Sequence, residues 1–422
     1  MEEVIQIDGG YRLNGELKVP GAKNATVALM PAAILGNGVI TMNGVPDIAD
    51  VDSLNDLLEE LGVTIIKHNK DSYVLDTTTM QNKTLDHKAV SKLRASYYFM
   101  GSILGKYGYC KIKMPGGCYL GPRPIDYHLK GFEALGATVE YDKGYYTIQA
   151  EQLIGNKIYL NFASVGATIN IMMAAIHAIG RTTIENAAKE PEIIDVANML
   201  NKMGAHIRGM GTSVITIDGV ARETMGGCVH EIIPDRIAAG TYIILAAAVA
   251  DYMKITNVIP AHLEALLSKL EDMGVNIDPD VDSITIRKTT QFLPIDVKTL
   301  VYPGLATDLQ QPLTALLTQA NGDSTVIDTI YPERFKHCGE LARMGADIDV
   351  SMGQAIVHGK TELFGEEVTA TDLRCGASLV IAGLMASGTT TIRGVDHIYR
   401  GYEHLVENLI ECGAHIKKTV ID

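Results

Sequence analysis

The feature that most constrains the fold is a unit of about 70 residues that occurs six times in the chain. Each copy ends on a short segment in which Leu, Met or Cys precedes a glycine, and in which Ala or Val, a polar residue and Ile or Val follow that glycine. The six glycines are Gly62, Gly136, Gly204, Gly274, Gly345 and Gly413. Six copies divide naturally into two domains of three, and residues that differ between equivalent positions become the candidates for function.

Composition excludes several classes of protein. The 422 residues carry 36 Lys and Arg against 50 Asp and Glu, a formal charge of −14, which argues against an extended nucleic-acid surface. Any anionic ligand must therefore meet a local cluster of cations. The six cysteines are far apart, without metal-ligand spacing, and the longest apolar helical runs fall well short of the roughly 20 residues that span a bilayer. We expect a cytoplasmic protein that binds neither nucleic acid nor membrane.

The third copy shows how one unit is built. An Ala/Ile/Met-rich helix is predicted over residues 164–179, a strand over 181–186, a second amphipathic helix from about 192 to 203 that ends at Gly204, and then a hairpin of two strands. Three such units can close around buried Ala-rich helices. The sequence therefore predicts an α/β fold with two domains, residues 1–20 with 233–422 and residues 21–232, and a cleft between them.

Polar residues interrupt the pattern at the start of the Ala-rich helices. Asp235, Asp308 and Asp372 lie where an acidic side chain caps a helix, so capping and function are both open to them. Cations are disfavoured at this end of a helix, unless an anion or a neighbouring carboxylate compensates them, or they lie on a solvated or salt-bridged surface. The cations at this point are Lys23, Arg94, Arg236 and Arg374.

The loop after the following strand is enlarged in the second copy. Residues 114–124 contain three glycines and three prolines around Cys118 and Arg123, a composition typical of a lid or an active-site loop. Cys118, flanked by glycine and close to an arginine, is expected to be an exposed, reactive thiol that acts as nucleophile or general acid. Four of the other five cysteines, Cys110, Cys338, Cys375 and Cys412, fit buried apolar positions better.

The Pro115-to-Asp126 segment with Cys118 resembles the UDP-N-acetylglucosamine 1-carboxyvinyltransferases, and the resemblance covers essentially the whole chain. It implies an inside-out α/β barrel in each domain, with three repeats and the helices buried inside. It also implies transfer of the enolpyruvyl group of phosphoenolpyruvate to the 3-hydroxyl of UDP-N-acetylglucosamine with release of phosphate, without cofactor or metal. The oligomeric state is left open.

The resemblance also assigns roles to residues. Cys118 matches the proposed acid, Asp308 matches the base, and Lys23, Arg123 and Arg400 match the phosphoenolpyruvate-binding set. Arg334, Asp372 and Arg374 match charged residues that line the cleft. The remaining matches are to contacts of the UDP-sugar, or accompany Lys23: Asn24, Arg94, Arg123, Pro124, Ile125, Asp126, Tyr127, Ser164, Val165, Gly166 and the backbone at Ile330.

One position departs from the family, and three alternatives remain. Many members carry a lysine where this chain has Phe162, so a nucleotide contact must differ there. The alternatives are an enolpyruvyl transferase that acts on shikimate 3-phosphate, a non-catalytic paralogue that binds a sugar nucleotide, and a relative of the RNA terminal phosphate cyclases. The first has no need of Cys118. The acidic charge and the lack of basic runs weigh against the last.

Overall fold

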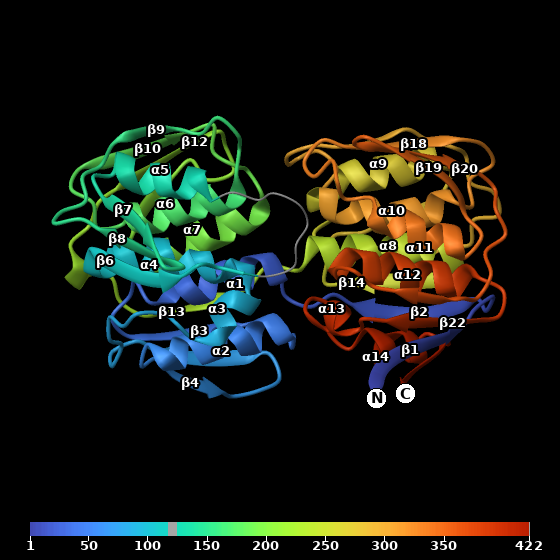
Figure 1. Ribbon diagram of the computed structural model, residues 1–422, viewed down its shortest axis with the longest axis horizontal. Coiled ribbons are helices and arrows are strands. Elements are labelled where there is room, and N and C mark those ends of the chain that lie inside the picture. The colour runs from blue at the N-terminus through green and yellow to red at the C-terminus, as the bar shows by residue number, and fades with distance from the viewer. Residues whose placement is uncertain (117–124, 422) are drawn as a thin grey trace. The chain divides into compact units, whose positions relative to one another are not determined.

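The computed structural model describes residues 1–116 and 125–421 and divides into two compact units. Unit 1 comprises Met1–Pro20 and Pro234–Asp422, and unit 2 comprises Gly21–Ile233. Each unit has its own hydrophobic core. Figure 1 shows helices in the middle of each unit and strands around them.

Unit 1 contains three four-stranded sheets, one for each of its repeats. In sheet order they are β21 (Glu367–Thr369), β22 (Thr389–Arg393), β1 (Glu2–Asp8) and β23 (His415–Ile421); β15 (Asn276–Pro279), β16 (Ser283–Arg287), β14 (Ala250–Thr256) and β2 (Leu13–Lys18); and β17 (Val297–Thr299), β18 (Ser324–Asp328), β20 (Gln354–His358) and β19 (Asp347–Ser351). Its helices are α8 (Arg236–Val249), α9 (Glu264–Asp272), α10 (Gln310–Leu317), α11 (Lys336–Arg343), α12 (Leu373–Met385), α13 (Asp396–Tyr399) and α14 (Leu405–Glu411), with 3-10 turns η3 (Pro260–His262) and η4 (Thr307–Leu309).

Unit 2 follows the same plan with two four-stranded sheets and one three-stranded sheet among its described residues. In sheet order they are β13 (Cys228–Glu231), β3 (Val39–Asn43), β5 (Ser72–Asp76) and β4 (Thr64–Lys67); β11 (His206–Arg208), β12 (Val214–Asp218), β10 (Arg181–Glu185) and β9 (Lys157–Tyr159); and β6 (Tyr109–Lys113), β8 (Tyr145–Gln149) and β7 (Thr138–Asp142). Its helices are α1 (Lys23–Ala33), α2 (Ala49–Glu60), α3 (Lys88–Lys92), α4 (Tyr98–Tyr107), α5 (Asp126–Ala134), α6 (Val165–Ala175) and α7 (Pro191–Met203), with η1 (Arg94–Tyr97) and η2 (Arg222–Thr224).

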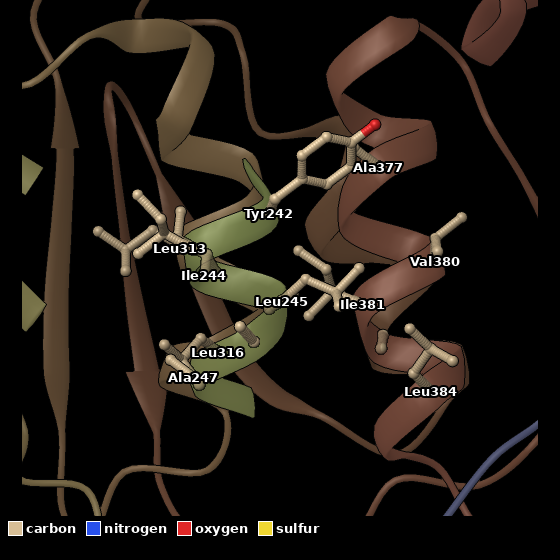
Figure 2. Packing of buried hydrophobic residues seen from close by; sticks show 14 of the residues in the cluster. Tyr242, Ile244, Leu245, Ala247, Leu313, Leu316, Ala377, Val380, Ile381 and Leu384 are labelled. Carbon is tan, nitrogen blue, oxygen red and sulfur yellow. The ribbon is translucent and has the colours of Figure 1, made fainter. Parts of the chain in front are cut away.

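The Ala-rich helices are buried on every side. All eight residues of α10 and 12 of the 14 residues of α8 are buried, so these helices have no solvent face. A helix that is apolar all round belongs in a core. Figure 2 shows side chains of α8, α10 and α12 meeting in the core of unit 1, among them Leu245, Leu316 and Ile381. The prediction of an inside-out α/β fold with buried Ala-rich helices is confirmed.

Three of the six copies contain a described strand that the pattern did not predict. This short strand precedes the Ala-rich helix and pairs in parallel with the strand after it, as β9 does with β10, β17 with β18 and β21 with β22. In the first and fourth copies the partners are exchanged, because β2, before α1, pairs with β14, and β13, before α8, pairs with β3. In the second repeat an isolated parallel bridge, Leu85 to Ile112, occupies this position beside β6. Three-residue strands are too short to show an alternating pattern in sequence.

The repeat glycines end the second helix of each copy as predicted for Gly204. All six have a left-handed backbone, with φ between +84° and +120°, a range that costs glycine little and other residues more. None of the helices within the described residues is long and apolar enough to cross a membrane.

Candidate active site

Two of the three aspartates at helix starts are caps, and the third is not. The carboxylate of Asp235 accepts hydrogen bonds from the amides of Ile237 (2.8 Å) and Ala238 (2.9 Å) at the start of α8. Asp372 accepts from the amides of Arg374 (2.9 Å) and Cys375 (3.1 Å) at the start of α12. The capping interpretation is therefore confirmed for these two. It is wrong for Asp308, which lies inside the 3-10 turn η4, whose N-cap is Ala306.

Asp308 instead pairs with two arginines. Arg334 Nη1 donates to Asp308 Oδ1 at 2.7 Å, and Arg374 Nη2 donates to Asp308 Oδ2 at 3.3 Å. Both guanidinium groups are almost fully buried, whereas the Asp308 side chain is 27% exposed. Two fixed cations thus share one carboxylate that reaches solvent. Of the groups in direct contact, two are cations and one is a carboxylate.

Arg374 is held from behind by a tyrosine. Its Nη1 donates to the hydroxyl of Tyr402 at 2.9 Å, and that hydroxyl also bonds Thr241 at 2.9 Å. Burial lowers the pKa of Arg374, but the neighbouring Tyr402, Asp308 and Asp235 outweigh it and raise the pKa above its usual range. The guanidinium is therefore a permanent, immobile cation.

Arg334 is held by the turn that carries Asp308 and by its own loop. Its Nη1 also donates to the hydroxyl of Thr307 at 3.2 Å, and its guanidinium lies over the ring of Tyr331. Ile330, a predicted UDP-sugar contact, is the residue before that tyrosine. Thr307 and Tyr402 were not singled out from the sequence, although Thr307 is adjacent to Asp308.

In unit 2, Lys23 is the first residue of α1 and forms an ion pair with Asp50 of α2 at 2.8 Å. The two side chains are only 12% and 7% exposed. The expectation that an anion or a carboxylate compensates this lysine is confirmed for the carboxylate. Asp50 was not predicted, because it lies in a different element, as the second residue of an ordinary amphipathic helix. Asn24 follows Lys23 within α1 and is half-buried.

The segment Ser164, Val165 and Gly166 forms the start of α6. The hydroxyl of Ser164 caps the helix by accepting from the amide of Ala167 at 3.3 Å. A Cβ on Gly166 would lie 2.8 Å from the hydroxyl of Tyr97 and 2.9 Å from Cε1 of His128, so only glycine fits. Three chemically different side-chain groups therefore gather at this helix start.

His128 belongs to the same group and is neutral. Asn170, whose Oδ1 accepts from the amide of Gly101, turns its Nδ2 toward His128 Nδ1 at 2.8 Å. Burial, and secondarily the charge of Arg94, lowers the pKa of His128 to about 3. Arg94 opens η1, the turn before α4.

The other predicted site residues are placed as follows. Ile125, Asp126 and Tyr127 lie at the start of α5, where Asp126 is 3.9 Å from Lys130. Arg400 directly follows α13 and is half-buried, and Phe162 is 42% exposed just before Ser164. Cys118, Arg123 and Pro124 lie outside the described residues. Within residues 1–116 and 125–421, no group of three or more His, Cys, Asp or Glu side chains is arranged to hold a metal ion.

Comparisons with known proteins agree with this architecture. The family model described as EPSP synthase (3-phosphoshikimate 1-carboxyvinyltransferase) matches residues 7–409. The structure of the enolpyruvyl transferase NikO from Streptomyces tendae superposes with a TM-score of 0.91 at 25% identity, covering 100% of both chains. An EPSP synthase from Acinetobacter baumannii gives a TM-score of 0.76 at 19% identity over 98% of this chain and 99% of the other, a likeness of fold alone.

Two relatives are much more similar in sequence. A protein of Geobacillus kaustophilus named UDP-N-acetylglucosamine 1-carboxyvinyltransferase 2 is 56% identical over 98% of this chain and 96% of its own. A protein of the same name from Listeria monocytogenes is 54% identical over 99% and 98% of the two chains. The chain therefore belongs to the UDP-N-acetylglucosamine 1-carboxyvinyltransferases, within the wider family of EPSP synthase.

Proposed function

We propose that the protein transfers the enolpyruvyl group of phosphoenolpyruvate to the 3-hydroxyl of UDP-N-acetylglucosamine and releases phosphate, a step in the synthesis of peptidoglycan precursors. The observation that carries this proposal is the 56% identity, over 98% of the chain, to a relative named for that activity. The arginine–aspartate cluster supports it chemically, because the reaction joins two anionic substrates.

The reaction needs a base, an acid and fixed cations. The sugar hydroxyl attacks C2 of phosphoenolpyruvate and gives up its proton, while the methylene carbon gains one. The C2–O bond to phosphate then breaks, and a proton leaves the new methyl group to restore the double bond. We assign the base to Asp308 and the acid to Cys118. Lys23, Arg123 and Arg400 bind the phosphoenolpyruvate anion, and the residues at the starts of α5 and α6 bind the UDP-sugar.

Asp308 is suited to its role by what restrains it. It lies inside the 3-10 turn η4 and its side chain is 27% exposed, so its carboxylate can meet a substrate. Its Oδ2 makes the longer of the two arginine contacts, 3.3 Å against 2.7 Å. An anionic substrate that approaches Arg374 competes for that contact. Oδ2 is then the oxygen that we expect to receive the proton.

The experiment is a phosphate-release assay with phosphoenolpyruvate and either UDP-N-acetylglucosamine or shikimate 3-phosphate. Release with UDP-N-acetylglucosamine, and its loss in Cys118→Ala, is the expected result. Release with shikimate 3-phosphate in place of the nucleotide sugar would establish the alternative acceptor. Binding of UDP-N-acetylglucosamine without any phosphate release would establish a non-catalytic paralogue.

Fosfomycin tests the thiol separately. Because this family's loop cysteine is its target, we expect the epoxide to alkylate Cys118 and to abolish phosphate release, which mass spectrometry of the labelled peptide would locate. Labelling of another cysteine, or full activity after labelling of Cys118, would contradict the assignment.

A further inference from the structure

A buried carboxylate behind the arginine–aspartate cluster has no role in the reaction as described. Asp328 ends β18 and is 1% exposed. Four donors surround it: Thr299 Oγ1 (2.8 Å) and the amides of Ile330 (2.9 Å) and Tyr331 (2.8 Å) on Oδ1, and Thr307 Oγ1 (2.7 Å) on Oδ2. All four are neutral. A buried carboxylate is costly unless it is hydrogen-bonded, and here two of the four donors belong to Thr307 and Tyr331, which contact Arg334.

The bond from Thr307 fixes the direction of the next one. A hydroxyl has one proton, and that of Thr307 is given to Asp328. Toward Arg334 the same oxygen can then only accept, and it receives a hydrogen bond from Nη1 at 3.2 Å. The same nitrogen gives its other proton to Asp308 at 2.7 Å. The four groups thus form a chain of donors and acceptors with one possible polarity.

Asp328 also fixes the position of Tyr331, the second residue that contacts Arg334. The amide of Tyr331 donates to Asp328, the ring of Tyr331 lies under the guanidinium, and its carbonyl accepts from the amide of Arg334 at 2.9 Å. Within the described part of the chain, Nε of Arg334 is buried without a hydrogen-bond partner. The arginine therefore depends on Thr307, Tyr331 and Asp308 for its position, and two of these three are anchored on Asp328.

We propose that Asp328 is a positioning residue for the transfer reaction, which orients Thr307 and the backbone at Ile330 and Tyr331 so that Arg334 meets Asp308. The inference rests on the proposed function, since it concerns the geometry of the base assigned there. Asp328 itself contacts no substrate in this account.

A substitution of Asp328 can disturb the series of hydrogen bonds from Asp328 to Asp308 and still keep the bonds to the backbone of Ile330 and Tyr331. In Asp328→Asn the amide oxygen can keep the three donors on the Oδ1 side, which leaves the amide nitrogen facing Thr307. The amide nitrogen and the hydroxyl of Thr307 are then both donors. The hydroxyl of Thr307 must therefore direct its proton toward Arg334, which is also a donor. We expect kcat to fall about 10- to 100-fold, the scale of a small misplacement of reacting groups, with little change in the KM for UDP-N-acetylglucosamine.

The chain offers a matched control, because the tetrapeptide Ala-Thr-Asp-Leu at residues 306–309 recurs at residues 370–373. Thr307→Val should lower kcat about tenfold and Thr307→Ser should retain it, whereas Thr371→Val in the second copy should leave it unchanged. The double variant Asp328→Asn/Thr307→Val should be no slower than Asp328→Asn alone, because both act through one chain of contacts.

Equal rates for Thr307→Val and Thr371→Val, or effects of Asp328→Asn and Thr307→Val that multiply, would overturn the inference. If Asp328→Asn does not fold, the valine and serine variants of Thr307 decide alone. Wild-type protein without phosphate release would instead refute the proposed function, so the two failures are distinguishable.

Discussion

The starts of α10 and α12 have the same four residues, Ala-Thr-Asp-Leu, and different structures. At α12 the aspartate, Asp372, has an extended backbone and caps the helix with its carboxylate. At α10 the same residues wind into η4, and Asp308 turns toward two arginines. Local sequence therefore does not decide which aspartate serves structure and which is available for chemistry.

The difference arises about 20 residues further along each copy. The strand after α10, β18, ends at Asp328, which accepts a hydrogen bond from the hydroxyl of Thr307. The strand after α12, β22, ends at the equivalent position on Arg393, whose side chain turns to Glu2 and Glu367. Within residues 1–116 and 125–421, the threonine of the first tetrapeptide, Thr307, donates to a buried carboxylate, and no such acceptor is found for Thr371. A tertiary contact thus selects between two local conformations of one sequence.

The largest expected effect separates the two aspartates by activity. Asp308→Asn removes the proposed base and should lower kcat about 10²- to 10⁴-fold, as measured by steady-state phosphate release. Asp251→Asn is the matched control, because Asp251 also contacts two cations, Arg12 and Lys288, but at the surface of a sheet. Comparable losses in both variants would show that general charge balance, and not the position of Asp308, supports the activity.

Next in size is the loss of a buried cation. Arg374→Met leaves Asp308 and Tyr402 without their shared donor and should lower the free energy of unfolding by about 3 kcal/mol. Denaturant titration measures this. Arg287→Met removes a guanidinium that lies over the ring of Tyr252 on an exposed strand, and should cost less than about 1 kcal/mol. A loss of unfolding free energy in Arg374→Met as small as that in Arg287→Met would contradict the claim that Tyr402 and Asp308 hold Arg374 in place.

The dependence of stability on pH below 7 tests His337, a buried histidine near Asp372. Burial lowers the pKa of His337 to about 3, although Asp372 opposes the shift. The unfolded chain takes up this proton below about pH 6.5 and the folded chain does not, so stability falls as the pH decreases from about 6.5 toward 3. The contribution is about 2 kcal/mol at pH 5.

Removing the imidazole of His337 should remove its share of that slope and leave the share of His128, whose pKa is also lowered to about 3. His337→Phe should make the dependence of unfolding free energy on pH between 7 and 5 clearly shallower, while His68→Gln, at an exposed position, should leave it unchanged. An unaltered slope in His337→Phe would assign the acid sensitivity to other groups, of which His128 is the first candidate.

The smallest effect concerns the cap itself. Asp372→Ala removes the acceptor for two amides of α12 and should cost about 1 kcal/mol, whereas Asp372→Ser keeps a capping oxygen and should recover most of that loss. Thermal unfolding of the pair measures the difference. Equal stability of the alanine and serine variants would contradict the claim that Asp372 stabilises α12 as its cap.

The sequence predicted the features that repeat and missed most of those that differ. The six glycines, the buried helices and the compensation of Lys23 were predictable, because periodicity and helix electrostatics act locally. The partners were not, since Asp50, Tyr402 and Asp328 lie in other elements and become neighbours only in the folded chain. The short parallel strands before the helices were not predicted, because three residues are too few to show a periodic pattern.

The most direct test isolates the chemical step in a single turnover. Wild-type protein and Asp308→Asn would be loaded with saturating UDP-N-acetylglucosamine and mixed with phosphoenolpyruvate at a concentration below that of the enzyme, and phosphate formation would be followed by rapid quench. We expect the variant to bind the nucleotide sugar but to form phosphate at least about 100-fold more slowly. An unchanged single-turnover rate would show that Asp308 takes no part in the chemistry.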